Sequence, residues 1–189
     1  MIEVEVKAKV LHPNEIIKRL KTQATFLKET IQEDIYFNAP DRDFRITDEA
    51  LRIRISSEGS ELTYKGPKIG NLMDKTREEI SVHINDLRKT RIILEKLGFH
   101  EVEKVSKKRI LFQFNDLSIS VDFVENLGEF IEIESLVNTQ NEIEIKRKEI
   151  LEFLNGLDVP LEDCERRSYL ELLLNKKGSI KNPSRIKNS

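Results

Sequence analysis

The first ten residues carry charged side chains in a spacing that could do chemistry. Glu3, Glu5 and Lys7 occupy alternate positions, and Val4 and Val6 fill the positions between them. Strict alternation of this kind is typical of a β-strand with one apolar and one charged face. Two neighbouring carboxylates could hold a metal ion, and the adjacent ammonium could hold an anion. The alternative is a surface strand whose charged face is solvated.

The same sorting of charge onto one face returns in later segments, which favours a shared site. Arg52 and Arg54, for example, alternate with Leu51, Ile53 and Ile55. The charged-face residues are Lys7, Arg52, Arg54, Lys65, Arg77, Lys107 and Arg109 among the cations, and Glu3, Glu5, Glu79, Asp122, Glu132 and Glu134 among the anions.

This combination of side chains favours a polyanion bound together with a divalent metal. Clustered carboxylates suit Mg²⁺ or Mn²⁺, which prefer oxygen ligands and often retain substrate phosphates. Arginine suits phosphate because its planar fork binds two oxygens at once. The pattern therefore indicates a triphosphate substrate with one or two metal ions.

Composition and motifs exclude several other classes of protein. The 32 basic and 34 acidic residues nearly cancel, so no global charge attracts nucleic acid or membrane. The sequence has no GxxxxGK[ST] or GxGxxG motif, and its three histidines form no metal-binding pattern. The single cysteine, Cys164, allows no intrachain disulfide, and no apolar run reaches about 20 residues. We expect a cytoplasmic protein with no nucleic-acid or membrane partner, and leave a homodimer open.

Strands and helices must position these side chains within one domain. We predict a single domain over residues 1–175 and a basic, disordered tail over residues 176–189. Four helices are predicted: one that starts at Pro13, one that is capped by Asn85 and ends at residue 97, one over 141–154 and one over 163–175. The last of these helices would contain Cys164. Polar loops are predicted at 38–43 and at 66–75. Strands are predicted at 1–10, 25–37, 51–55, 61–65, 77–82, 101–114, 117–123 and 130–134.

Two architectures satisfy this pattern of charged strands and amphipathic helices. A closed antiparallel barrel could turn its charged faces inward and cover its apolar outer faces with helices. A flat α+β sheet could instead place helices on one side and water on the other. Alternation alone leaves both architectures open.

The ordered set of motifs resembles the CYTH domain, the family of triphosphate tunnel metalloenzymes. The likeness spans residues 1–174 and is closest to the class IV adenylyl cyclase (CyaB-type) branch. Its motifs are Glu3-x-Glu5-x-Lys7, Asp34-Ile35-Tyr36-Phe37, Leu51-Arg52-Ile53-Arg54, Thr63-Tyr64-Lys65-Gly66-Pro67, Arg77-x-Glu79, Lys107-Lys108-Arg109 and the acidic segment 121–134.

The resemblance implies an α+β, mainly β fold: a closed eight-stranded antiparallel barrel, or tunnel, with helices packed outside. It implies conversion of ATP to cyclic AMP and pyrophosphate with Mg²⁺ or Mn²⁺. Related branches hydrolyse inorganic triphosphate or thiamine triphosphate, and a non-catalytic triphosphate-binding module is a third alternative. Nothing in the sequence shows selection of adenine.

The resemblance also implies a role for each charged residue. Catalysis would involve Glu3, Glu5 and Lys7, while Arg77 and Glu79 could instead pair with each other. Tyr36 would touch the nucleoside end or pack, and Tyr169 would belong to the core. The metal set is Glu3, Glu5, Glu79, Asp122, Glu132 and Glu134, with Asp122 as a ligand or a group behind the ligands. The phosphate set is Lys7, Arg52, Arg54, Lys65, Arg77, Lys107 and Arg109.

Overall fold

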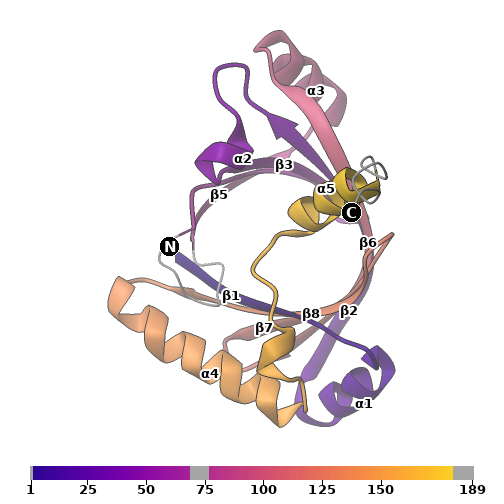
Figure 1. Cartoon of the computed structure of the whole chain (residues 1–189), viewed down its shortest axis with the longest axis vertical. Coiled ribbons are helices and arrows are strands. Elements are labelled where there is room, and N and C mark those ends of the chain that lie inside the picture. The colour runs from indigo at the N-terminus through magenta and orange to yellow at the C-terminus, as the bar shows by residue number, and fades with distance from the viewer. Residues whose placement is uncertain (1, 69–76, 181–189) are drawn as a thin grey trace, which may run out of the picture.

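A computed structural model describes residues 2–68 and 77–180, and the strands in these ranges form one closed antiparallel barrel (Figure 1). The hydrogen-bonded order around the barrel is β1-β5-β4-β3-β2-β6-β7-β8. The closed barrel is therefore confirmed, and the flat sheet is wrong. The strands are β1 Ile2–Lys9, β2 Thr25–Asn38, β3 Ala50–Ser56, β4 Gly59–Lys65, β5 Arg77–Ile84, β6 His100–Phe114, β7 Leu117–Val124 and β8 Gly128–Val137.

Helices pack around the outside of the barrel and against one end (Figure 1). Helix α4 contacts β1 and β8, α1 contacts β2, and α5 contacts β6. None of the helices in the described ranges is both long enough and apolar enough to cross a membrane. The helices are α1 Pro13–Gln23, α2 Phe44–Thr47, α3 Leu87–Lys96, α4 Ile143–Gly156 and α5 Tyr169–Ile180, with 3₁₀ turns at Gln140–Glu142 and Leu161–Asp163.

The structure corrects the predicted starts of α3 and α5 and adds a helix, α2, that was not predicted. Helix α3 is capped by Asp86, not Asn85, because the Asp86 carboxylate accepts the Lys89 backbone N–H at 2.9 Å. The predicted polar loop at 38–43 is followed directly by the unpredicted helix α2, whose cap is Asp43. Helix α5 begins at Tyr169, six residues later than predicted.

The chain before α5 is extended because its backbone bonds to β1. Cys164 forms an antiparallel bridge with Ala8, so the prediction of a helix there was wrong. The Glu165 N–H donates to the Lys7 carbonyl oxygen at 2.7 Å. Helix α5 then continues to Ile180, five residues into the predicted tail. The rest of that tail, 181–189, and most of the predicted 66–75 loop lie outside the described residues.

The barrel has its apolar core outside and its charges inside. On β1, Val4 and Val6 point outward and are fully buried, while Glu3 and Glu5 point inward. The outward faces of β1, β7 and β8 pack against the buried side of α4, which includes Ile150 and Leu154. Burial of this outer apolar layer stabilises the barrel and leaves its interior available for charge.

Truncation of the α4 contact should destabilise the protein. Leu154 is fully buried in the layer between α4 and the barrel. We expect Leu154→Ala to lower the free energy of unfolding by about 2–5 kcal/mol, because it leaves a cavity. Urea denaturation measures this change. Ile145→Ala on the exposed side of the same helix, where Ile145 is 71% exposed, should stay within about 0.5 kcal/mol of wild type. Equal losses in both variants would contradict this packing.

Candidate functional site

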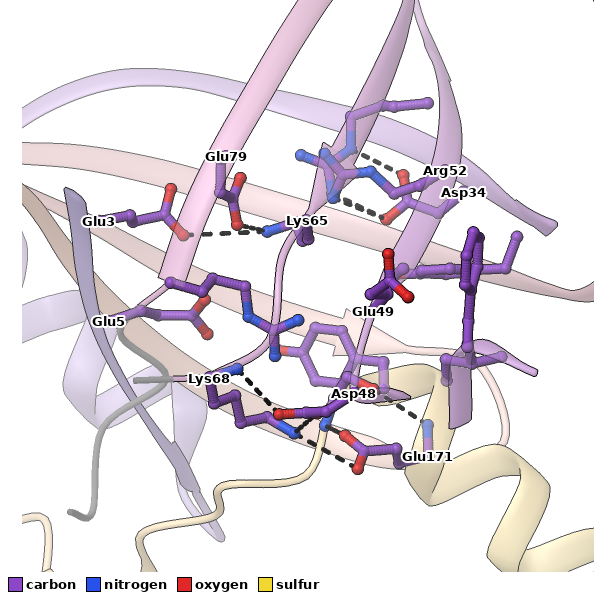
Figure 2. Close-up of a pocket in the computed structure, with 18 of the residues that line it drawn as sticks. Glu3, Glu5, Asp34, Asp48, Glu49, Arg52, Lys65, Lys68, Glu79 and Glu171 are labelled. Carbon is purple, nitrogen blue, oxygen red and sulfur yellow. Dashed lines mark hydrogen bonds and ion pairs between the residues drawn. The ribbon is translucent and has the colours of Figure 1, made fainter. Parts of the chain in front are cut away.

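The barrel interior holds a cavity of about 560 Å³ lined largely by charged side chains (Figure 2). Inward-pointing residues of seven strands contribute to it, because every second residue of a strand faces the lumen. Helix α2 with the turn that follows it, and the start of α5, complete the wall. Twelve of the fourteen residues predicted for the site line this cavity: Glu3, Glu5, Tyr36, Arg52, Arg54, Lys65, Arg77, Glu79, Lys107, Arg109, Glu132 and Glu134.

Carboxylates gather where β1 lies between β8 and β5. Glu5 and Glu134 are directly opposite each other across the β1–β8 pair, and Glu3 is two residues from Glu5. Like charges in such cross-strand positions repel. Burial raises the pKa of Glu3 well above its usual value, and the Glu134, Glu79 and Glu5 carboxylates raise it further. Burial and the Glu5 and Glu132 carboxylates likewise raise the pKa of Glu134.

Lys65, on strand β4, neutralises part of the negative charge of this acidic cluster. Its ammonium forms an ion pair with Glu79 and lies 3.8 Å from a Glu3 carboxylate oxygen (Figure 2). Burial opposes ionisation of Glu79, but Lys65 holds the pKa of Glu79 below its usual value. Glu79 therefore pairs with Lys65 of the neighbouring strand. Arg77, buried at the start of β5, lies opposite Glu3 in the β1–β5 register.

Asp34 organises two arginines on the opposite wall. Arg54 donates to both Asp34 oxygens at 2.7 Å each, and Arg52 lies 3.7 Å from one of them. Burial opposes ionisation of Asp34, yet the two guanidinium groups hold its pKa well below the usual range. Arg52 also donates weakly to Thr63 at 3.3 Å. Its buried Nε–H has no hydrogen-bond partner among the described residues, so Arg52 retains a donor for an anion.

Asp122 organises a second pair of cations from behind the cavity wall. It is fully buried and does not line the cavity. Arg109 donates to both of its oxygens at 2.7 and 2.6 Å, and Lys107 donates at 3.2 Å. Arg109 also pairs with Glu132. Burial lowers the pKa of Lys107 to about 8, with a further decrease from the nearby Arg109 guanidinium.

Lys7 is the second predicted residue that does not line the cavity. Its ammonium donates to the Arg167 carbonyl oxygen at 2.5 Å and lies 4.1 Å from the centre of the Tyr169 ring. The side chain is almost completely buried. The extended segment before α5 therefore covers Lys7, although Lys7 shares the inward face of β1 with Glu3 and Glu5.

Sequence reasoning assigned no part in the site to Asp34 and Tyr169, two residues that organise the cations. Asp34 could have been found, because it occupies the alternate position to Tyr36 and therefore shares its inward face. Tyr169 was assigned to the core, and it is buried there, but its hydroxyl also donates to Asp122 at 2.9 Å. No periodicity distinguishes Tyr169 from the leucines that follow it.

The carboxylates of β1 and β8 have the chemistry of a divalent metal site. As the side chains stand, the described residues contain no group of three or more His, Cys, Asp or Glu side chains arranged to hold a metal. The donor set nonetheless fits Mg²⁺ or Mn²⁺, which take carboxylate oxygens. Burial, together with the neighbouring carboxylates, raises the pKa values of Glu3 and Glu134, and a bound cation would favour the charged form of both.

Inward charges, a closed antiparallel sheet and outer helices define a barrel protein with a charged internal cavity. A model of the CYTH domain matches residues 1–169. The chain therefore belongs to the CYTH domain family, one of metal-dependent triphosphate tunnel enzymes.

Individual relatives agree with this membership. The chain is 47% identical over 173 residues to MJ0240 of Methanocaldococcus jannaschii, provisionally named an adenylate cyclase, with 91% of this chain and 98% of the relative covered. It is 25% identical over 148 residues to adenylate cyclase CyaB of Aeromonas hydrophila, covering 77% and 74% of the two chains. The solved structure of the PH1819 protein from Pyrococcus horikoshii OT3 has 45% identity and a TM-score of 0.85, covering 92% and 99%.

Removal of one repelling carboxylate should stabilise the metal-free protein. Because the folded-state pKa of Glu134 is raised above its ordinary 4.5, wild type loses stability as pH rises from about 4.5 through that raised pKa. We expect Glu134→Gln to raise the melting temperature at pH 7 in EDTA by roughly 2–4 °C, the shift produced by about 1 kcal/mol. The gain should shrink at pH 5, where the wild-type carboxyl is closer to neutral.

Differential scanning fluorimetry measures both values. Glu152→Gln is the matched control, because the Glu152 side chain is 69% exposed on α4. If metal-free Glu134→Gln melted at a lower temperature than wild type, the negative charge of Glu134 would already be neutralised by neighbouring cations, and the expected repulsion would be refuted.

Proposed function

We propose that this protein is a metal-dependent enzyme that acts on a triphosphate, with class IV adenylyl cyclase-like conversion of ATP to cyclic AMP and pyrophosphate. The observation that carries the proposal is the cavity, where cations held by Asp34 and Asp122 face the carboxylates of β1 and β8. Two relatives that carry adenylate cyclase names support the choice of reaction.

The charge balance of the cavity favours a metal with the substrate. Among the described lining residues, ten are acidic and eight are basic. A triphosphate would add further negative charge, so cations must accompany it. The acidic residues are Glu3, Glu5, Asp34, Asp48, Glu49, Glu61, Glu79, Glu132, Glu134 and Glu171, and the basic ones are Arg45, Arg52, Arg54, Lys65, Lys68, Arg77, Lys107 and Arg109.

We assign the metal first to Glu3, Glu5 and Glu134, whose mutual repulsion a divalent cation relieves. Glu132 and Glu79 are adjacent candidates that now pair with Arg109 and Lys65. Asp122 is proposed as the group that orients Arg109 and Lys107, since its oxygens are occupied behind the wall.

The chain's own residues would bind and orient the triphosphate. Arg52 offers its unpartnered Nε–H, and Arg54 retains N–H groups beyond the two that Asp34 accepts. Lys65, Arg77, Lys107 and Arg109 complete the cradle. Lys7 remains a predicted phosphate and catalytic group, but its ammonium must leave the Arg167 carbonyl to reach the cavity.

In the cyclase reaction, the ribose 3′-hydroxyl attacks the α-phosphorus in line, and the bond to pyrophosphate breaks. The hydroxyl proton leaves to solvent or base. Arginine and lysine side chains stabilise the charge that develops on the pyrophosphate. A bound Mg²⁺ or Mn²⁺ would supply Lewis acidity and lower the pKa of the attacking hydroxyl.

A triphosphatase is the second candidate, with inorganic triphosphate or thiamine triphosphate as substrate. The observation that favours it is that every cation assigned above would contact phosphate, and these contacts are the same for all three substrates. In that reaction water attacks the terminal phosphorus. A binding module is less favoured, because plain polyanion binding needs no carboxylate cluster.

Product analysis should separate these reactions. We expect incubation with Mn²⁺ and ATP to yield cyclic AMP and pyrophosphate, whereas Glu3→Gln or Glu5→Gln should abolish turnover because a metal ligand is lost. Glu95→Gln, on the exposed side of α3, is the control and should retain activity. Orthophosphate from inorganic triphosphate without cyclic AMP would identify a triphosphatase. Full activity of both Gln variants at limiting metal would refute their role.

Replacement of Arg52 should weaken triphosphate binding. Lysine keeps the positive charge of Arg52 but loses the planar fork and the buried Nε–H. We expect Arg52→Lys to weaken binding of a non-hydrolysable triphosphate with Mg²⁺ about tenfold or more, since a charge-assisted hydrogen bond contributes about 1.5–3 kcal/mol. Calorimetric titration measures the affinity. Arg54→Lys should behave similarly, and Arg88→Lys on the exposed face of α3 should bind like wild type. Wild-type affinity in both cavity variants would remove these arginines from the cradle.

A further inference from the structure

We propose that Tyr169, the first residue of α5, is a positioning residue that aligns Lys107 and Arg109 for the substrate's phosphates. The inference rests on the proposed function, because it assumes that these cations hold a triphosphate. It assigns to the C-terminal helix a part in the active site, in addition to its packing against the barrel.

The Tyr169 hydroxyl acts through Asp122. It donates to the same Asp122 oxygen that accepts Arg109 at 2.6 Å and Lys107 at 3.2 Å. The other Asp122 oxygen accepts Arg109 at 2.7 Å. Asp122 does not line the cavity, whereas both cations do. The hydroxyl therefore stabilises the orientation of a carboxylate that in turn orients two phosphate-binding groups.

The ring of Tyr169 contacts cations as well. The Lys7 ammonium lies 4.1 Å from the ring centre and the Lys107 ammonium lies 5.0 Å from it, both within cation–π range. The ring of Phe130 packs edge-on against Tyr169 with centres 5.1 Å apart. A phenylalanine at position 169 would keep these ring contacts, so only the hydroxyl contribution changes in Tyr169→Phe.

The start of α5 is anchored independently of the phosphate cradle. Lys68 joins α5 to the end of α2, because its ammonium lies 2.8 Å from Asp48 and 3.5 Å from Glu171 (Figure 2). Glu171 also accepts the Ser168 backbone N–H at 2.6 Å. These contacts place residue 169 at the barrel end without help from Asp122. The Tyr169 position can therefore impose an orientation on Asp122.

A packing role alone does not account for this arrangement. Tyr169 is buried beside Tyr36, Phe130 and Leu173, and phenylalanine would fill the same space. The hydroxyl is instead bonded to Asp122, a carboxylate that holds two lining cations, Lys107 and Arg109. Burial raises the pKa of Tyr169 well above its usual value, so the hydroxyl stays protonated and donates.

The first test compares two Tyr→Phe variants by calorimetric titration with imidotriphosphate and Mg²⁺. We expect Tyr169→Phe to weaken binding about threefold to tenfold, the range for one lost hydrogen bond. Tyr64→Phe is the matched control, because the Tyr64 hydroxyl also donates to a carboxylate, Glu49, at 2.7 Å, and Glu49 forms an ion pair with Arg42, which does not line the cavity. It should bind like wild type. Wild-type affinity of Tyr169→Phe, or an equal loss in Tyr64→Phe, would overturn the proposal.

A double-mutant cycle tests whether Tyr169 acts through Asp122. In the Asp122→Asn background, Tyr169→Phe should cause less than a twofold further loss of affinity, because residues acting as one unit are non-additive. If Asp122→Asn does not fold, Lys107→Gln replaces it, and the Tyr169→Phe loss should again shrink. Full additivity in the cycle would show that Tyr169 does not act through Asp122 and would overturn the proposal.

Turnover of wild type separates this inference from the proposed function. Binding without turnover of ATP or inorganic triphosphate by wild type would reject the enzyme and leave the Tyr169 comparison valid. Wild-type turnover with unchanged binding by Tyr169→Phe would reject the positioning role alone. Absence of imidotriphosphate binding by wild type would overturn both.

Discussion

The structure depends on pairing charges that a closed barrel removes from water. Two carboxylates, Asp34 and Asp122, each bind an arginine through both oxygens, Arg54 in one case and Arg109 in the other. Breaking a buried ion pair is costly, because it leaves one charge uncompensated in a poorly solvating interior. These pairs therefore hold the arginines in fixed positions. They also explain why the barrel needs an apolar layer outside, between its strands and its helices, as its main source of stability.

Like charges lie close together where β1 lies between β8 and β5, and this gives the interior its polarity. Glu5 opposes Glu134 directly, and Lys65 is the nearby cation that compensates Glu3 and Glu79. On the opposite wall, the cations Arg52, Arg54, Lys107 and Arg109 line the cavity, and the buried Arg52 Nε–H has no hydrogen-bond partner among the described residues. An interior divided in this way suits a ligand that brings both cations and anions, which is what a metal-bound triphosphate provides.

The last helix connects the barrel's charges to the outer structure. Its first turn is tied to Lys68 at the cavity rim, and the extended chain before it covers Lys7. The cavity wall is therefore built partly from segments that are far apart in the chain: β1, α2 with the turn that follows it, and the start of α5. Through Asp122, this arrangement brings a C-terminal tyrosine into contact with cations of β6.

The alternation of residue types determined which side chains face the barrel interior, because a strand's side chains point to opposite faces with a period of two. That rule placed residues such as Glu5, Arg52 and Lys65 correctly on the cavity wall. The alternation could not determine how deep in the barrel each side chain lies, or which inward-facing charges form ion pairs with each other. Lys7 has the same alternation as Glu5, yet the tertiary structure covers it with the chain before α5. Asp122 also follows the alternation of its strand, yet it lies behind the cavity wall. Its position depends on hydrogen bonds from Arg109 and Tyr169, two residues that are distant from it in the sequence.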